Sequence, residues 1–491
     1  MTSYRALSQR AEEVGRNGTR GEGGARGRWA ALRAWRPAAW LAWPSLALLS
    51  FFAYGMAFIW GHYMFLDLKV YMGAAHELLV GHDPYDYPFT FVKLYATYPP
   101  FAMAVLAPFS VVPIHAMVYL WSLASLACLA LLLSLVLGEV GPPSWHMASR
   151  RWRALLSLLF ALTAVIAIQP VRANFGFGQI NIFLITMSTA DVLRKGRRGR
   201  GVLIGLAAAV KFTPLIFVVL LVLERDWRAV MRSIMAFITV TAVTWLIVPS
   251  VSARYFLHLN TMDKRIGTPT YVSNQSINGI LHRLGMGGAF ATVTWFVLSV
   301  AVIAVAAMVA RRLLDTGQSA LLVLLVIAVA GLLASPISWD HHWSWVALFP
   351  LALLDKSLRR PVRAGFLAVI IVAVAAFYWW HYAEGQGYGI PTGPLTQVAD
   401  DSLALAGIAF IGTWAWVLRK QISLKDLSPW ALLMKSASTT PGQSPSGALR
   451  LPADPGRLPA VPSEGRASLE RRQRWRKKTS PSRRRAFERP E

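Results

Sequence analysis

The stretch that decides how this chain folds runs from Ser335 to Trp343 and reads SPISWDHHW, between two apolar runs that look membrane-spanning. It sets an acid and two histidines, Asp340, His341 and His342, side by side. Titratable groups are costly next to hydrocarbon, so a group of them at the rim of a membrane predicts a functional site. A second polar group, which begins at Asp67, follows the first apolar run. The pattern is typical of a membrane enzyme.

Composition supports a polytopic membrane protein. The 491 residues are 55% hydrophobic and only 15% charged, with a mean hydropathy of +0.44. Apolar runs recur at close to the roughly 20 residues that a helix needs to cross a bilayer. We predict an all-α fold with about ten to twelve crossings, outer-face loops and short surface helices. Spanning helices are predicted at 39–61, 113–138, 154–170, 180–193, 233–249, 288–310, 319–334, 343–354, 364–380 and 402–418.

Three segments predict helices that do not cross the membrane singly. Residues 201–223 lie between two basic segments, and the sequence Lys211 to Pro214 interrupts the run at its middle. Two short helices that meet at a broken tip would explain this, and broken backbone at membrane depth must line a cavity or be buried in protein. Residues 99–112 are too short to cross and predict a half-helix. Residues 68–80 have the 3.6-residue period of a short amphipathic surface helix.

The net charge of +26 is distributed as the positive-inside rule requires. If residues 1–38 are cytoplasmic, the alternate segments that follow on the same side hold, together with them, 42 of the 50 lysines and arginines. Both termini are therefore predicted to be cytoplasmic, and the active site extracytoplasmic. The charge is explained by topology and predicts no nucleic-acid partner.

Composition divides the chain into three parts. Residues 1–38 are rich in Gly and Arg, and residues 421–491 form a basic tail that is rich in Ser, Pro and Arg over most of its length. Both are predicted to be largely disordered and cytoplasmic, because they cannot bury enough apolar surface to offset ordering entropy. Residues 39–420 form the multi-spanning domain between them. A single cysteine, Cys128, excludes a disulfide framework and is predicted to be a core residue.

Asp67 is the candidate general base. A carboxylate held at the boundary of water and lipid needs only hydrogen-bond reach to an acceptor hydroxyl and a suitable pKa, which partial burial raises. Spacing alone equally allows Asp67 to be the N-cap of a helix that starts near Leu68. On the same predicted face, Asp340 can orient one imidazole, and a histidinium, from His341 or His342, would stabilise a leaving phosphate.

Cations and amides supply candidate substrate contacts. Lys211 is the sharpest candidate for an anionic headgroup, because a lysine in an apolar run demands a partner. Further candidates for the donor phosphate are Arg172, Lys264 and Arg265, although solvation alone would account for the last two. The candidate substrate-binding residues are Tyr71, Asp83, Tyr98, Asn174, Gln179, Asn181, Asn274, Gln275 and Asp340. Asn274 to Ser276 also matches a glycosylation sequon, a weak pattern.

The first outer loop contains no Asp-x-Asp pair. An enzyme that uses a sugar diphosphate with a metal would want such a pair. The sequence therefore favours a metal-free site, without a cofactor, for a lipid-linked monophosphate donor.

At these residues the chain resembles the bacterial polyprenol-phosphate-mannose-dependent alpha-mannosyltransferases, glycosyltransferase family 87 of the GT-C fold, relatives of which act on mycobacterial phosphatidylinositol mannosides. The matching pieces follow the family's order across about residues 40–420. They are Asp67 to Tyr71, Gly81 to Tyr85, Tyr98 to Pro100, Gly178 to Asn181, Lys211 to Pro214, Asn274 to Ser276 and Ser335 to Trp343.

The resemblance implies inverting transfer of mannose from polyprenyl-phosphate mannose to a lipid or glycan acceptor at the outer face of the cell membrane. It implies that Asp67 is the base and that His341 or His342 contacts the donor phosphate or the reacting centre. Two alternatives stay open. One is a GT-C transferase for another polyprenyl-phosphate sugar, such as arabinose or glucose. The other is a transporter or flippase for a lipid-linked sugar, which a charged outer cavity and broken helices would also suit.

Overall fold

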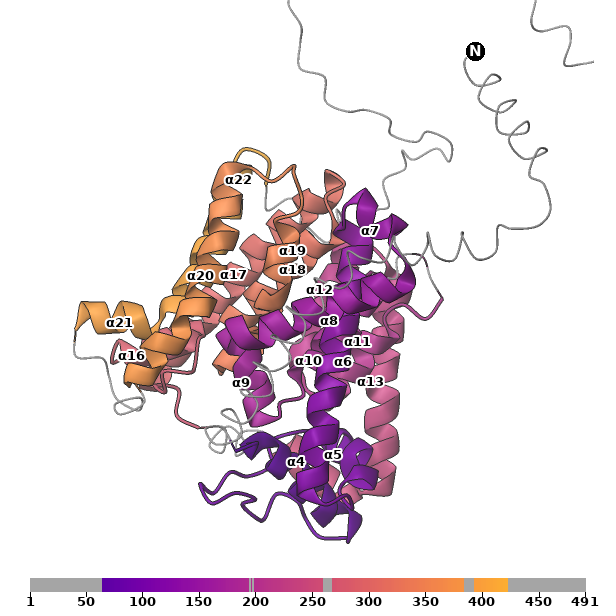
Figure 1. Ribbon diagram of the computed structural model, residues 1–491. Helices are drawn as coiled ribbons and strands as arrows, with labels where there is room; N and C mark the ends of the chain where they lie inside the picture. The colour runs from indigo at the N-terminus through magenta and orange to yellow at the C-terminus, as the bar shows by residue number, and fades with distance from the viewer. Residues whose placement is uncertain (1–63, 194–195, 197, 259–266, 384–392, 423–491) are drawn as a thin grey trace, which may run out of the picture. The chain divides into compact units, whose positions relative to one another are not determined.

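The computed structural model describes residues 64–193, 196, 198–258, 267–383 and 393–422, and the regular elements in these ranges are helices (Figure 1). The N-terminal half of the described chain comprises α4 (Leu66–Leu79), α5 (Pro100–Leu106), η1 (Ala107–Phe109), α6 (Ile114–Val140), α7 (Pro143–Met147), α8 (Arg150–Ala167), α9 (Gln169–Phe177), α10 (Asn181–Val192), α11 (Val202–Val210), η2 (Thr213–Leu215), α12 (Ile216–Leu223) and α13 (Trp227–Ile247). The C-terminal half comprises α14 (Pro249–Leu257), α16 (Ile277–Arg283), α17 (Gly288–Asp315), α18 (Ala320–Ala334), η4 (Asp340–Leu348), α19 (Phe349–Ala352), α20 (Arg360–Ala383), α21 (Pro394–Asp400) and α22 (Ser402–Leu418).

The described helices have the lengths and surfaces of a multi-pass membrane protein. Three of them, α6, α13 and α17, are long and apolar enough to cross a bilayer alone, and the bent pairs α8–α9 and α21–α22 each qualify when counted as one span. Helix α17 exposes large apolar side chains such as Phe290 and Phe296, which suits lipid rather than water. The predicted crossing at 39–61 lies outside the described residues.

Helix α18 is the centre of the main hydrophobic core. Nearly all of its side chains are buried, and it packs against α17, α12 and α22. A helix that is apolar all round is buried in protein or faces lipid, and α18 is enclosed by the helices around it. Its 15 residues end at Ala334, directly before the Ser335 to Trp343 segment.

Two helical runs are interrupted near a proline, and both interruptions shape the site. The expected run 201–223 is two helices, α11 and α12, separated at Lys211 and the short η2, so the predicted broken tip is confirmed. The expected straight span 154–170 is wrong at its end, because the chain bends by 90° between α8 and α9. Pro170 sits in the first turn of α9, where its missing N–H is tolerated, and Ile168, the N-cap of α9, has extended backbone.

Two further expectations are corrected. The surface helix begins at Leu66, two residues earlier than predicted, so Asp67 lies in its first turn and is not an N-cap. The predicted spanning helix 343–354 is instead the 3-10 helix η4 followed by the single turn α19. η4 contains His341 and His342 and packs against α9.

Candidate active site

The site begins where α4 rests on the end of α9. The backbone N–H of Phe65 donates to the carbonyl of Gly176 at 3.0 Å, and α9 ends at Gly178 in the left-handed conformation, with φ of +69°. A side chain at that position would lie 2.6 Å from the Cβ of Leu68. Only glycine allows both this backbone geometry and this close approach. The contact brings Gln179, the next residue, to Asp67.

Gln179 is the centre of a polar network. Its Nε2 donates to Asp67 Oδ2 at 2.7 Å, and its Oε1 accepts from the Tyr71 hydroxyl at 2.9 Å and from Tyr98 at 3.3 Å. The two phenol oxygens lie 2.7 Å apart. Asn181 Nδ2 approaches the same Oε1 at 3.4 Å and the carbonyl of His341 at 3.3 Å. One amide side chain therefore links the candidate base to elements from three parts of the chain.

Lys211 enters this network from the break between α11 and η2. Its Nζ lies 3.1 Å from the Tyr98 hydroxyl, 3.0 Å from Asn181 Oδ1 and 3.0 Å from His342 Nε2. The ammonium is also 5.2 Å from the centre of the Tyr98 ring, a cation–π distance. Lys211, which lies in an apolar run of the sequence, thus has three polar partners for its ammonium group.

The two histidines of η4 have different surroundings. The His342 imidazole contacts Lys211, and its ring stands nearly perpendicular to the His341 ring, with 4.8 Å between centroids. His341 is buried, with its Nδ1 3.3 Å from Asp340 Oδ1 and its ring against the edge of Phe177. Asp340 in turn accepts from Gln169 Nε2 and from the Ser273 hydroxyl, each at 2.6 Å.

The electrostatics suit proton transfer by Asp67. Burial raises the pKa of its carboxyl above the usual range, against the lowering effects of His341, Gln179 and Lys211. Burial opposes ionisation of Asp340 too, but His341, Ser273 and Gln169 hold the pKa of Asp340 below its usual value. Burial, Lys211 and His341 together lower the pKa of His342, so its imidazole is neutral and accepts a hydrogen bond from the lysine.

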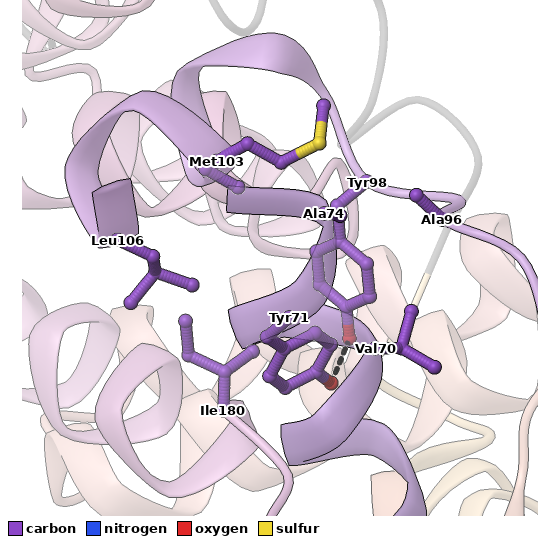
Figure 2. A pocket seen from close by; sticks show the side chains of 9 residues that line it. Val70, Tyr71, Ala74, Ala96, Tyr98, Met103, Leu106 and Ile180 are labelled. Carbon is purple, nitrogen blue, oxygen red and sulfur yellow. Dashed lines mark hydrogen bonds between the residues drawn. The ribbon is translucent and has the colours of Figure 1, made fainter. Parts of the chain in front are cut away.

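A small apolar pocket adjoins the two phenols (Figure 2). The hydroxyls of Tyr71 and Tyr98 meet at one side of it, and the rest of the wall is aliphatic. The other lining residues are Val70, Ala74, Ala96, Ala102, Met103, Leu106 and Ile180. The polar network therefore has an apolar surface beside it.

Several predicted substrate contacts serve other parts of the fold. Asp83 accepts from Arg254 at 2.7 Å, together with Asp86, and so holds the first loop to α14. Gln275 is fully buried and accepts from the first backbone N–H groups of α22, at Leu403 and Ala404, so it caps that helix.

The amide of Asn274 is also structural. It accepts from the Ser338 N–H at 2.9 Å and donates to the carbonyl of Pro269, and the residue is fully buried, which leaves no room for a glycan. Asn174 donates to the carbonyl of Gln179 within the same turn.

Of the other predicted cations, the structure describes only Arg172. Arg172 Nη1 donates to the carbonyl of Ile166 across the α8–α9 bend at 2.7 Å. Lys264 and Arg265 lie outside the described residues. Within those residues, no three His, Cys, Asp or Glu side chains gather as a metal-binding group, and the metal-free site stays a prediction.

Sequence reasoning missed Gln169 and Ser273 as site residues. They contact Asp340 from positions 171 and 67 residues away. Their only local signal was their place near candidates: Ser273 precedes Asn274, and Gln169 lies three residues before Arg172. Proximity to Asp340 depends on the α8–α9 bend, at which Pro170 only hints, and on the path of the loop before α16, which no local pattern predicts.

Comparisons with known proteins agree on one family. The family model described as glycosyltransferase family 87 matches residues 96–336. The chain is 31% identical over 331 residues, 64% of this chain and 75% of the relative, to a polyprenol-phosphate-mannose-dependent alpha-(1-2)-phosphatidylinositol mannoside mannosyltransferase of Mycolicibacterium smegmatis. It is 29% identical over 364 residues, 67% of this chain and 83% of the relative, to a protein of the same name from Mycobacterium tuberculosis.

A more distant relative carries a different sugar in its name. The chain is 24% identical over 371 residues, 67% of this chain and 85% of the relative, to an alpha-(1->3)-arabinofuranosyltransferase of Corynebacterium glutamicum. No solved structure matches the chain.

Proposed function

Because the chain belongs to glycosyltransferase family 87, a family of membrane glycosyltransferases, we propose that it moves a mannosyl residue from polyprenyl-phosphate mannose to a mannosylated phosphatidylinositol lipid. Family membership sets aside the transporter alternative. The donor and the acceptor follow the names of the relatives. The charge distribution supports transfer at the extracytoplasmic face, with both termini in the cytoplasm.

The observation that carries the mechanism is the joining of Asp67 and Lys211 by neutral groups. Gln179 and Tyr98 link the carboxylate to the ammonium, so both charged groups border one polar space. In the proposed reaction the acceptor hydroxyl attacks the anomeric carbon, and Asp67 takes its proton. The bond from that carbon to the phosphate oxygen breaks, the electron pair leaves with the polyprenyl phosphate, and the configuration inverts.

The other residues of the network have complementary roles. Lys211 offsets the charge that develops on the leaving phosphate. The raised pKa of Asp67 makes its carboxylate a stronger base than an exposed aspartate. The pocket beside Tyr71 and Tyr98 offers an apolar wall for the isoprenoid unit nearest the phosphate.

A transfer assay tests this function. Membranes that contain the full chain receive synthetic polyprenyl-phosphate mannose with a radiolabelled sugar and a phosphatidylinositol mannoside extract. Label should enter a new lipid product with wild-type chain and with Asp86→Asn, an exposed carboxylate that shares Arg254 with Asp83. Asp67→Asn should form almost no product although it inserts normally. Near-normal turnover by Asp67→Asn would exclude it as the base.

A second donor deserves a direct comparison, because one relative is named an arabinofuranosyltransferase. The same membranes receive polyprenyl-phosphate arabinose in parallel. Faster transfer from that donor would replace mannose by arabinose in the proposal. The roles of Asp67 and Lys211 would then be tested with the same variants and that donor.

A further inference from the structure

The Asp340 carboxylate is held by side chains from two distant segments. Gln169 at the start of α9 donates to Oδ2, and Ser273 in the loop before α16 donates to Oδ1, both at 2.6 Å. Asp340 is 4% exposed, so water does not compete strongly for these bonds. Both carboxylate oxygens are therefore directed by neutral donors, and the carboxylate cannot rotate without losing one of them.

Backbone pairing fixes Ser273 against the histidine segment. Asn274 and Trp339 form an isolated antiparallel bridge, and the Gln275 N–H donates to the carbonyl of Ser338 at 2.7 Å. The same loop is tied further by Arg283, which is buried and donates both to the carbonyl of Asn274 and to Asp401. Ser273 and Asp340 thus face each other across a short rigid pairing.

His341 is the group of this segment that is left available to bond a ligand. Its side chain is buried, and in the described part of the chain neither ring nitrogen has a hydrogen-bond partner, although Nδ1 lies 3.3 Å from Asp340. Because Nδ1 faces Asp340, Nε2 lies on the opposite edge of the ring. His342 differs, since Lys211 already occupies its Nε2. A buried nitrogen without a partner is unfavourable unless a ligand supplies one.

We propose that Ser273 and Gln169 are positioning residues that fix Asp340, and through it the His341 imidazole, to contact the phosphate of the polyprenyl donor. The proposal rests on the proposed function. With Nδ1 of the imidazole turned to Asp340, its Nε2–H donates to a phosphate oxygen. The proposal also gives the adjacent histidines separate roles: His341 contacts the phosphate, and His342 accepts a hydrogen bond from Lys211.

Binding of polyprenyl phosphate, the reaction product, tests the proposal without chemistry. The full chain in nanodiscs should bind it about tenfold more weakly after Ser273→Ala or Gln169→Ala, which is the effect of one lost hydrogen bond to a charged group. Ser273→Thr keeps the hydroxyl and should restore binding. The matched control Thr268→Ala, in the same loop with an exposed hydroxyl, should bind as wild type does.

A double-mutant cycle separates positioning from a structural role. Ser273→Ala should weaken binding in the wild-type background and have no further effect in His341→Gln, because it acts through that ring. An equal loss in both backgrounds, or unchanged binding by Ser273→Ala and Gln169→Ala, would overturn the proposal. Thermal unfolding of each variant shows whether it is folded.

Failure of the positioning roles of Ser273 and Gln169 can be told apart from failure of the proposed mannosyl transfer. Polyprenyl phosphate is common to all donors of this type, so a wild-type chain that uses another sugar still permits the binding test. Wild-type chain that neither binds polyprenyl phosphate nor transfers any sugar from it would overturn both proposals.

Discussion

Helix α11 connects two groups of charges that are built in opposite ways. At its start lies the Arg200 cluster, which we define as Asp191, Arg200, Glu224 and Asp226. Here opposite charges pair directly: Arg200 is 4% exposed and contacts both Glu224 and Asp226, the latter at 3.0 Å. Asp191 accepts from the first N–H groups of α11. Each carboxylate of the cluster therefore has Arg200 or a helix N-terminus as its partner.

At the end of α11 lies Lys211, whose neighbours are neutral. It bonds to a phenol, an amide and an imidazole, and Asp67 bonds to the amide of Gln179. Among the described residues no ion pair joins Asp67 to Lys211. Direct pairing holds helices together, whereas opposite charges separated by amides and phenols remain available to a substrate. The comparison thus sets a structural group of charges against the proposed catalytic one.

The strongest test of this distinction exchanges an aspartate in each group. Asp67→Asn should lower transfer by about 10³-fold, because it removes the general base, and should leave unfolding unchanged. Asp191→Asn should lower stability and leave turnover per folded enzyme near wild type. Transfer assays and thermal unfolding in detergent measure both effects. A stable, inactive Asp191→Asn would contradict the structural role.

Removing the cation from the site should have the next largest effect. Lys211→Met keeps the length of the side chain and should reduce kcat by about 10²-fold, because the leaving phosphate loses its compensating charge. Lys69→Met on α4 is the matched control and should retain activity. Single-turnover transfer measures the step directly, and a Lys211→Met variant as fast as the control would argue against a role in leaving-group departure.

The Arg200 cluster should instead respond in stability. Arg200→Met removes the cation that Glu224 and Asp226 both contact, so the free energy of unfolding should fall by about 3–5 kcal/mol, the usual effect of breaking a buried ion pair. Arg198→Met, at an exposed position in the same turn, should change stability little. Turnover per folded molecule should stay the same, and a selective loss of kcat in Arg200→Met would blur the distinction between the two groups.

The smallest expected effect is a shift in pH dependence. Asp67 must be ionised to act, and burial raises its pKa, so the acid limb of kcat/KM should lie above the range of an exposed aspartate. The Gln179 hydrogen bond lowers that pKa, so Gln179→Leu should move the limb to still higher pH. Gln318→Leu, which loses only a bond to Ser357, is the control. A limb that does not move would show that Asp67 does not govern it.

Sequence predicts the frame of this molecule better than its polar contacts. The apolar runs locate α6, α13, α17 and α22, and the break at Lys211 follows from a charge and a proline inside an apolar run. The 90° bend before α9 was missed, although Pro170 is its local cause.

The site could be predicted only in part, for a physical reason. Asp67 and Lys211 are conspicuous because charges are rare near hydrocarbon. Amides are ambiguous: Gln179 contacts the candidate base, whereas Gln275 caps a helix, and nothing in their neighbouring residues separates the two roles. The contacts of Asp340 with Gln169 and Ser273 exist only after distant segments pack.

The wide separation of the site's parts along the chain bears on biosynthesis. Asp67 is made early, Lys211 comes 144 residues later, and His341 follows after another 130. A nascent chain that has inserted its first helices therefore holds a carboxylate without its cation, and then both without the histidines. The proposed site is therefore complete only after the chain has been synthesised beyond His341.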